Sequence, residues 1–258
     1  MTSQHILIFD FDGVIIDGIW EYWISSTKAY WKIIGKENHL DPFNSNIPKD
    51  FRILRPWVKS GWEMVLLTAE LLQADSFLKA SGASIFSKHY ERNCLEALNK
   101  WGWSPEQLQA ALDDVRREAI RKDRKRWLTS HQAFPLVAER IKQFKNESIE
   151  FGVLTTKSAE FTLELLDHLN LHPKLLYGHE AGDKASMLLK ISKETPIAGF
   201  IEDRRKTLET VLNTPGLKSI PCYLANWGYL KPLDNKNLPS GIQLLEKRKF
   251  LSPLANWS

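Results

Sequence analysis

The chain opens with an apolar segment, His5 to Phe9, that stops at two aspartates and a glycine: Asp10-Phe11-Asp12-Gly13. A continuous apolar strand is typical of a parallel sheet covered by helices on both faces. Ligand sites in such sheets lie just beyond the carboxyl ends of the strands. Residues two apart on an extended segment point to the same side, and Gly13 permits a sharp turn because it lacks a Cβ. Two adjacent carboxylates repel each other, so this pattern favours a bound divalent cation, with loop capping as the alternative.

Composition narrows the class of protein. The 258 residues are 43% hydrophobic and 26% charged, with a net charge of +4, as in soluble globular proteins. Cys94 and Cys222 give no disulfide framework. The chain shows no secretory signal pattern and no stretch of the roughly 18 apolar residues that span a bilayer. We therefore expect a soluble, cytoplasmic protein with no nucleic-acid or membrane partner.

Strand and helix patterns alternate in the second half of the chain. Apolar runs of strand length occur at 149–154, 175–177, 197–201 and 219–224, and helical patterns separate them. This alternation predicts an α/β fold with a doubly wound parallel sheet. The strand at 219–224 is expected to be the last, and the tail from Asp234 to be irregular.

The first strand is separated from the next by a long helical stretch. A βαβ unit needs only roughly 30 residues, so residues 18–134 are predicted to form an inserted all-helical domain without strands. The core is then residues 1–17 and 135–258. Within the insert we expect one buried helix from Ile53 to Leu72, a loop from Asp41 to Pro48, and a helix from Pro105 to about Trp127 with Ser104 as its N-cap.

A basic run at 116–126 falls on that last helix. Acidic residues interleave with it at helical spacing, including Asp114, Glu118 and Asp123. We interpret it as a solvated helix face with i, i+4 ion pairs, not as a nucleic-acid site.

Polar side chains follow three of the predicted strands at the point where each strand ends: Asp10 with Asp12, Thr155, and Glu202 with Asp203. The carboxyl ends of parallel strands meet at one edge of the sheet. Carboxylates, a hydroxyl and an ammonium together suit phosphoryl transfer, whose charged oxygens must be positioned and neutralised.

The ammonium is predicted to come from Lys184, at the start of a helix; Lys157 and Lys190 are alternatives. Taken singly, Thr155 could cap a helix and Lys184 could be solvated.

The sequence resembles the haloacid dehalogenase (HAD) superfamily. The resemblance rests on Asp10-Phe11-Asp12-Gly13-Val14, Thr155, Lys184 and Phe200-Ile201-Glu202-Asp203-Arg204, in the family's order, and on the helical insertion, which the family calls a C1 cap. It implies a phosphatase in which Asp10 is the nucleophile and Asp12 the general acid and base. It also implies that Thr155 and Lys184 bind phosphate, and that Mg²⁺ is held by Asp10, Asp12 through its backbone carbonyl, and Asp203.

One position departs from the family pattern. The second acid of the fourth motif is replaced by Thr207, so Glu202 is an alternative metal ligand. The expected activity is Mg²⁺-dependent hydrolysis of a small phosphorylated metabolite through an aspartyl-phosphate. The alternatives are a sugar-phosphate mutase and a catalytically weak HAD-fold binding protein.

Overall fold

The computed structural model describes residues 5–36 and 46–257, which divide into two compact units. The sheet unit comprises residues 1–17 and 132–258, and the helical unit comprises Gly18–His131. The second boundary falls before Gln132 because β3 (Gln132–Ala133) pairs antiparallel with β2 (Ile16–Asp17). This short strand corrects the expectation that no strand precedes Phe134. None of the described helices has the length and hydropathy to cross a bilayer.

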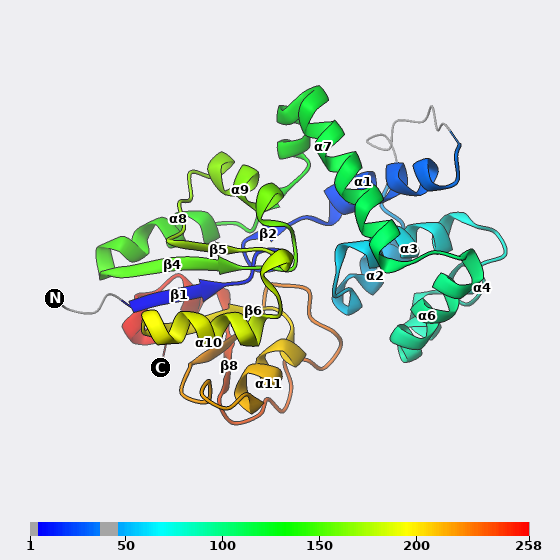
Figure 1. Ribbon diagram of the computed structural model, residues 1–258. Helices are drawn as coiled ribbons and strands as arrows, with labels where there is room; N and C mark the ends of the chain where they lie inside the picture. Colours follow the sequence, from blue (N-terminus) through cyan, green and yellow to red (C-terminus); the bar gives the residue numbers. More distant parts are fainter. Residues whose placement is uncertain (1–4, 37–45, 258) are drawn as a thin grey trace. The chain divides into compact units, whose positions relative to one another are not determined.

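The sheet unit contains a six-stranded parallel sheet in the order β5-β4-β1-β6-β7-β8 (Figure 1). The strands are β1 (His5–Phe9), β4 (Ile149–Leu154), β5 (Leu175–Tyr177), β6 (Ile197–Glu202), β7 (Cys222–Ala225) and β8 (Ile242–Leu245). The chain builds outward from β1 through β4 and β5, then crosses to β6, β7 and β8 on the other side. The predicted doubly wound parallel sheet is confirmed, and its topological switch point lies at the carboxyl end of β1.

The tail was predicted wrongly. Ile242–Leu245 is not irregular; it is an edge strand paired in parallel with β7. Ile242 and Leu245 are buried, so the short apolar run gains its stability from packing onto the sheet.

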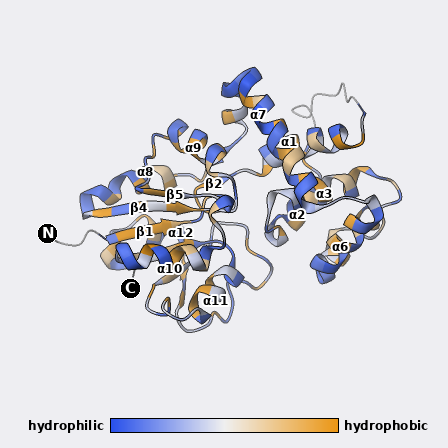
Figure 2. Cartoon of the chain, in the orientation of Figure 1, coloured by the Kyte–Doolittle hydropathy of each residue, from blue (hydrophilic) through white to orange (hydrophobic). Residues whose placement is uncertain are grey.

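Helices and the C-terminal segment cover the two faces of the sheet. Their bounds are α8 (Val137–Gln143), η4 (Phe144–Glu147), α9 (Ala159–His168), η5 (His179–Ala181), α10 (Lys184–Glu194), α11 (Arg205–Asn213), α12 (Lys247–Phe250) and η6 (Leu254–Asn256). Ile6 and Ile8 share one apolar cluster with Leu188 of α10 and Leu208 of α11. Phe9 points to the other face, where its ring lies 6.1 Å from Phe144 and 6.3 Å from Phe250. The strands are accordingly among the most hydrophobic segments of the chain (Figure 2).

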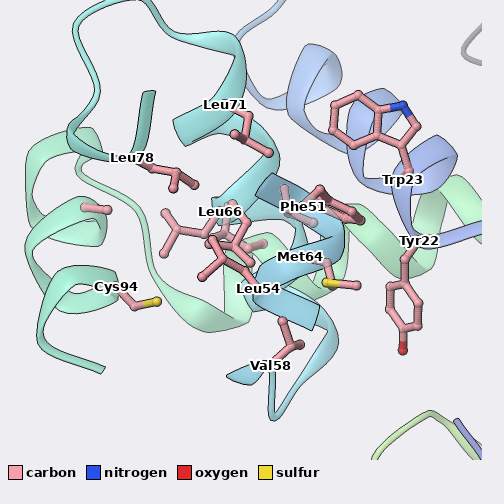
Figure 3. Close-up of a cluster of buried hydrophobic side chains, with 14 of the residues drawn as sticks. Tyr22, Trp23, Phe51, Leu54, Val58, Met64, Leu66, Leu71, Leu78 and Cys94 are labelled. Atoms are coloured by element: carbon pink, nitrogen blue, oxygen red, sulfur yellow. The ribbon is translucent and has the colours of Figure 1, made fainter. Parts of the chain in front are cut away.

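The helical unit is built from helices alone in the part that the structure describes. They are α1 (Ile19–Ile33), α2 (Lys49–Leu54), η2 (Arg55–Trp57), α3 (Gly61–Leu72), α4 (Phe77–Ser81), α5 (Ala83–Phe86), η3 (Ser87–His89), α6 (Tyr90–Trp101) and α7 (Pro105–Thr129). Their shared core includes Trp23, Phe51, Met64, Leu66 and Cys94 (Figure 3). Most of the loop expected at 41–48 lies outside the described residues.

Two helices differ from the prediction. The single helix expected over Ile53–Leu72 is broken, because Pro56 lies in a 3₁₀ turn and Ser60 starts α3 through a capping box with Glu63. Helix α7 begins as predicted, with the Ser104 hydroxyl accepting from the Gln107 amide. However, Asp123 leaves the helical conformation inside it, at φ −157° and ψ 81°, and its carboxylate caps the following turn at the Arg126 amide.

Candidate active site

The site lies at the switch point of the sheet, where β1 ends between β4 and β6. Phe9 pairs with Val153 on one side and with Ile201 on the other. The Asp10 amide continues the ladder to the Ile201 carbonyl at 2.8 Å. The polar residues that follow β1, β4 and β6 are therefore neighbours at one edge, as the sequence predicted.

Asp10 and Glu202 share one lysine. Lys184, the first residue of α10, places its Nζ 2.7 Å from Asp10 Oδ1 and 2.7 Å from Glu202 Oε2. Asp183 fixes the start of this helix because its carboxylate accepts from the Ser186 amide at 3.0 Å. Of the three lysines considered from the sequence, Lys184 is thus the one beside the first aspartate.

The buried charges around Lys184 perturb one another. Burial, together with the charge of Glu202, raises the pKa of Asp10 to about 7 despite the attraction of Lys184. Burial alone would raise the pKa of Glu202, but Lys184 draws it below its ordinary value. Burial would lower the pKa of Lys184, yet the two carboxylates raise it. Lys184 therefore stays charged, and burial is least compensated at Asp10, whose ionised form is destabilised.

Asp203 completes an acidic cluster. One carboxylate oxygen each from Asp10, Glu202 and Asp203 lie within 4.8 Å of one another, and all three residues are buried. The chain turns at this point, because Glu202 Oε1 accepts from the backbone amides of Asp203 and Arg204, each at 3.1 Å. That turn is what allows adjacent residues to point to one place.

Two glycines leave the space that the Asp203 side chain occupies. A Cβ on Gly13, whose φ is +94°, would lie 1.9 Å from Asp203 Oδ2, and one on Gly228 would lie 2.4 Å from Asp203 Cβ. The Tyr229 amide donates to Asp203 Oδ2 at 2.8 Å, and the Tyr229 hydroxyl donates to Asp17. Sequence reasoning missed Gly228 and Tyr229, although they follow the end of β7 and a search of every strand end would have found them.

Asp12 lies beside a different lysine. Lys157 Nζ is 3.6 Å from Asp12 Oδ2, and the Lys157 side chain is fully buried. Asp12 Oδ1 is buried and has no hydrogen-bond partner among the residues that the structure describes.

The remaining candidates divide between this edge and other places. Thr155 is buried directly after β4, and its hydroxyl accepts from the Lys157 amide at 3.1 Å. Lys190 instead lies over the Tyr177 ring, 5.9 Å from its centroid. Thr207 is in the first turn of α11 and is not a member of the acidic cluster.

This donor set fits a hard divalent cation. Four carboxyl groups, Asp10, Asp12, Glu202 and Asp203, gather at this edge of the sheet with the ammonium groups of Lys157 and Lys184. Oxygen ligands in a small buried cluster are what Mg²⁺ prefers. Asp10, Glu202 and Asp203 each have a carboxylate oxygen close enough to the others to share such an ion.

Comparisons with known proteins support the fold. No family model matches the sequence, and no curated protein matches it. Among solved structures, a protein from Clostridium acetobutylicum described as a predicted phosphatase has a TM-score of 0.58 at 13% identity, over 97% of both chains. A haloacid dehalogenase-like hydrolase from Streptococcus pneumoniae has a TM-score of 0.54 at 18% identity, over 100% of both.

The same fold also carries another named reaction. Protein Tyrosine Kinase A of Mycobacterium tuberculosis has a TM-score of 0.52 at 14% identity, over 100% of this chain and 97% of that one. Identities this low speak to architecture alone, and fold does not by itself fix the reaction. The architecture expected from the resemblance is nevertheless found, and this chain has the fold of the haloacid dehalogenase-like hydrolases.

Proposed function

We propose that the protein is a Mg²⁺-dependent phosphatase that hydrolyses a small phosphomonoester through an aspartyl-phosphate. The observation that carries this proposal is the arrangement at the end of β1. Asp10 lies 2.7 Å from a charged lysine and beside two further acids, with Asp12 two residues on. The names of the HAD-like hydrolases with the same fold agree with it.

In the proposed reaction, an Asp10 carboxylate oxygen attacks phosphorus and forms an O–P bond. The ester P–O bond breaks, its electron pair goes to the leaving oxygen, and that oxygen takes the proton held by Asp12. Water then attacks the phosphorus of the aspartyl-phosphate and gives a proton to Asp12. This step releases phosphate and restores the Asp10 carboxylate.

The other residues bind and orient the phosphoryl group. Lys184 and the Thr155 hydroxyl donate to its oxygens. Asp10, Asp203 and the Asp12 backbone carbonyl would hold Mg²⁺, with Glu202 fixing Lys184 and the turn. When bound, Mg²⁺ would supply positive charge to the phosphoryl oxygens and to the clustered carboxylates.

The test is phosphate release from a panel of phosphomonoesters, with Mg²⁺ and with chelator, by the wild type and Asp10→Asn. We expect Mg²⁺-dependent release that Asp10→Asn reduces by more than about 10³-fold, because the nucleophile is lost. Substantial turnover by a clean Asp10→Asn preparation would contradict the assignment of the nucleophile. An isomerised product instead of free phosphate would indicate a mutase.

A further inference from the structure

Lys157 is a second buried cation at the site, and the proposed reaction leaves it without a role. Its side chain is 0% exposed, whereas that of Lys184 is 11% exposed. Its Nζ lies 3.6 Å from Asp12 Oδ2. An ammonium is costly to bury without a polar or charged neighbour, and the Asp12 carboxyl group lies beside it.

The backbone of Lys157 is fixed from two sides. Its amide donates to the Thr155 hydroxyl at 3.1 Å, and its carbonyl accepts from the His179 amide at 3.1 Å. Gly178 lies so close that a Cβ there would be 2.3 Å from the Ala159 amide nitrogen and 2.9 Å from the Lys157 carbonyl oxygen. The turn after β4 therefore has little freedom, and it fixes the origin of the lysine side chain beside Asp12.

The two oxygens of Asp12 have different surroundings. Oδ2 faces the ammonium, while Oδ1 is buried without a hydrogen-bond partner among the described residues. A carboxyl group held through one oxygen keeps the other at a defined place for a reacting atom.

We propose that Lys157 is a positioning residue that holds the Asp12 carboxyl group for proton transfer to the leaving oxygen. This inference rests on the proposed phosphatase function and adds to it: the site uses two lysines with separate tasks. Lys184 contacts the nucleophile Asp10 and binds the phosphoryl group, whereas Lys157 positions the general acid Asp12.

The test uses leaving groups of different basicity. The leaving oxygen of an alkyl phosphate needs a proton because an alkoxide is strongly basic. The leaving group of a dinitrophenyl phosphate is dinitrophenolate, a stable anion that departs without a proton. For Lys157→Met we expect kcat/KM, which reports formation of the aspartyl-phosphate, to fall about 10²-fold on the alkyl ester and less than about 3-fold on the dinitrophenyl ester, since general acid catalysis contributes roughly 10²–10⁴-fold. Hydrolysis of the aspartyl-phosphate is common to both esters, so a loss in that step lowers both kcat values and leaves the difference in kcat/KM intact. KM should not rise on either ester, because uniform binding is unchanged.

Two controls separate positioning from general damage. Lys190→Met removes a lysine that lies over the Tyr177 ring, outside the site, and should leave both esters unaffected. The double variant Asp12→Asn with Lys157→Met should be no slower than Asp12→Asn alone, because a positioning residue has nothing to position once the acid is gone. If Lys157→Met fails to fold, Lys157→Gln keeps a polar group without the charge.

Several results would overturn the inference. They are an equal loss of kcat/KM on both esters, a rise in KM on both, additivity with Asp12→Asn, or no loss of kcat/KM at all. If the wild type hydrolyses no ester, it is the proposed function that fails. Crystal structures of the wild type and Lys157→Gln then decide the positioning role, and an Asp12 carboxylate unmoved by the substitution would refute it.

Discussion

The two units of the molecule bury charge in different ways. In the helical unit, Glu21 of α1 and Arg116 of α7 form two parallel hydrogen bonds of 2.8 and 2.7 Å, and each side chain is 1% exposed. Ser25 donates to the same carboxylate at 2.6 Å. In the sheet unit, burial and the charge of Glu202 raise the pKa of Asp10 to about 7 despite its contact with Lys184, and Asp12 Oδ1 lacks a hydrogen-bond partner among the described residues.

This difference separates structural from functional burial of charge. In a hydrogen-bonded ion pair, each charge is compensated by its partner, so the pair needs no ligand to stabilise it. An unbalanced cluster lowers the stability of the folded chain, and a bound cation or reacting group can relieve it. Buried acidic and basic residues therefore have different roles in the two units. Replacing one member of the pair in the helical unit should destabilise the fold, whereas replacing an acid of the cluster in the sheet unit should stabilise it.

The largest effect is expected from Arg116→Met. This change leaves Glu21 buried without its main partner, which typically costs about 3–5 kcal/mol of unfolding free energy. Denaturant unfolding measures the loss. Adding Glu21→Met to the same chain should recover most of it, because both charges are then gone. Arg117→Met is the matched surface control, since its pair with Asp114 is half exposed; a loss as large as that of Arg116→Met would contradict this distinction.

In the sheet unit, Asp10→Asn should stabilise the metal-free protein. The pKa of Asp10 is raised from 3.8 to about 7, so the folded chain binds more protons than the unfolded chain between these values. The wild type therefore loses stability as pH rises through that window. In chelator, the advantage of Asp10→Asn should grow from pH 4 to pH 7 and reach on the order of 2 kcal/mol, because each tenfold change in a proton equilibrium is worth about 1.4 kcal/mol and Asn forfeits part of the attraction to Lys184.

Thermal melts of both proteins in chelator across this pH range measure the difference. An advantage that is constant with pH would show that the ionisation of Asp10 is not what destabilises the site. A disadvantage at every pH would show that the contact between Asp10 and Lys184 matters more than the burial of the carboxylate.

The sequence predicts the cluster of acids at the end of β1 but not the ion pair between Glu21 and Arg116. Apolar runs that end in polar residues mark Asp10, Thr155 and Asp203, because the strand pattern is local and parallel topology brings the ends together. Glu21 and Arg116 are 95 residues apart. The basic run at 116–126 was predicted to be a solvated helix face, and this is wrong for Arg116, whose side chain is 1% exposed and pairs with Glu21. Only tertiary packing brings them together.

Other features of the sheet unit escape prediction for related reasons. β8 is four residues long and depends on its pairing with β7, so its own sequence carries little strand preference. Gly228 and Tyr229 contact Asp203 from a strand end without a charged residue. A search guided by titratable groups therefore passes over them.

A smaller effect is expected from the cation itself. If Mg²⁺ binds with a Kd near 1 mM, 10 mM Mg²⁺ stabilises the folded chain by about 1.4 kcal/mol. Asp203→Asn should reduce that gain, while Asp114→Asn, on the surface of the helical unit, should keep it. Melting temperatures with and without Mg²⁺ provide the measurement. An undiminished gain in Asp203→Asn would move the ligand role to Glu202.

The smallest effect concerns a compensated carboxylate in the sheet unit. Glu147 accepts from Arg140 at 2.6 Å and from the Leu254 amide at 2.7 Å. Burial alone would raise the pKa of Glu147, but these partners lower it below 4.5. The stability they provide is therefore present above pH 4.5 and is lost as pH falls through the folded-state pKa.

The unfolding free energy of the wild type should exceed that of Glu147→Gln by about 0.2–1 kcal/mol near neutral pH. This difference should narrow below pH 4.5, because protonation removes the charge that Arg140 pairs with. Denaturant midpoints of both proteins at each pH measure it, and a constant gap would assign the effect to packing. Glu147 and Asp10 belong to one sheet unit, yet their variants should diverge from wild type with opposite pH slopes. A carboxylate with enough partners strengthens the fold as it ionises. The carboxylate at the proposed site weakens the fold as it ionises, and a cation or a phosphoryl group can compensate for that loss.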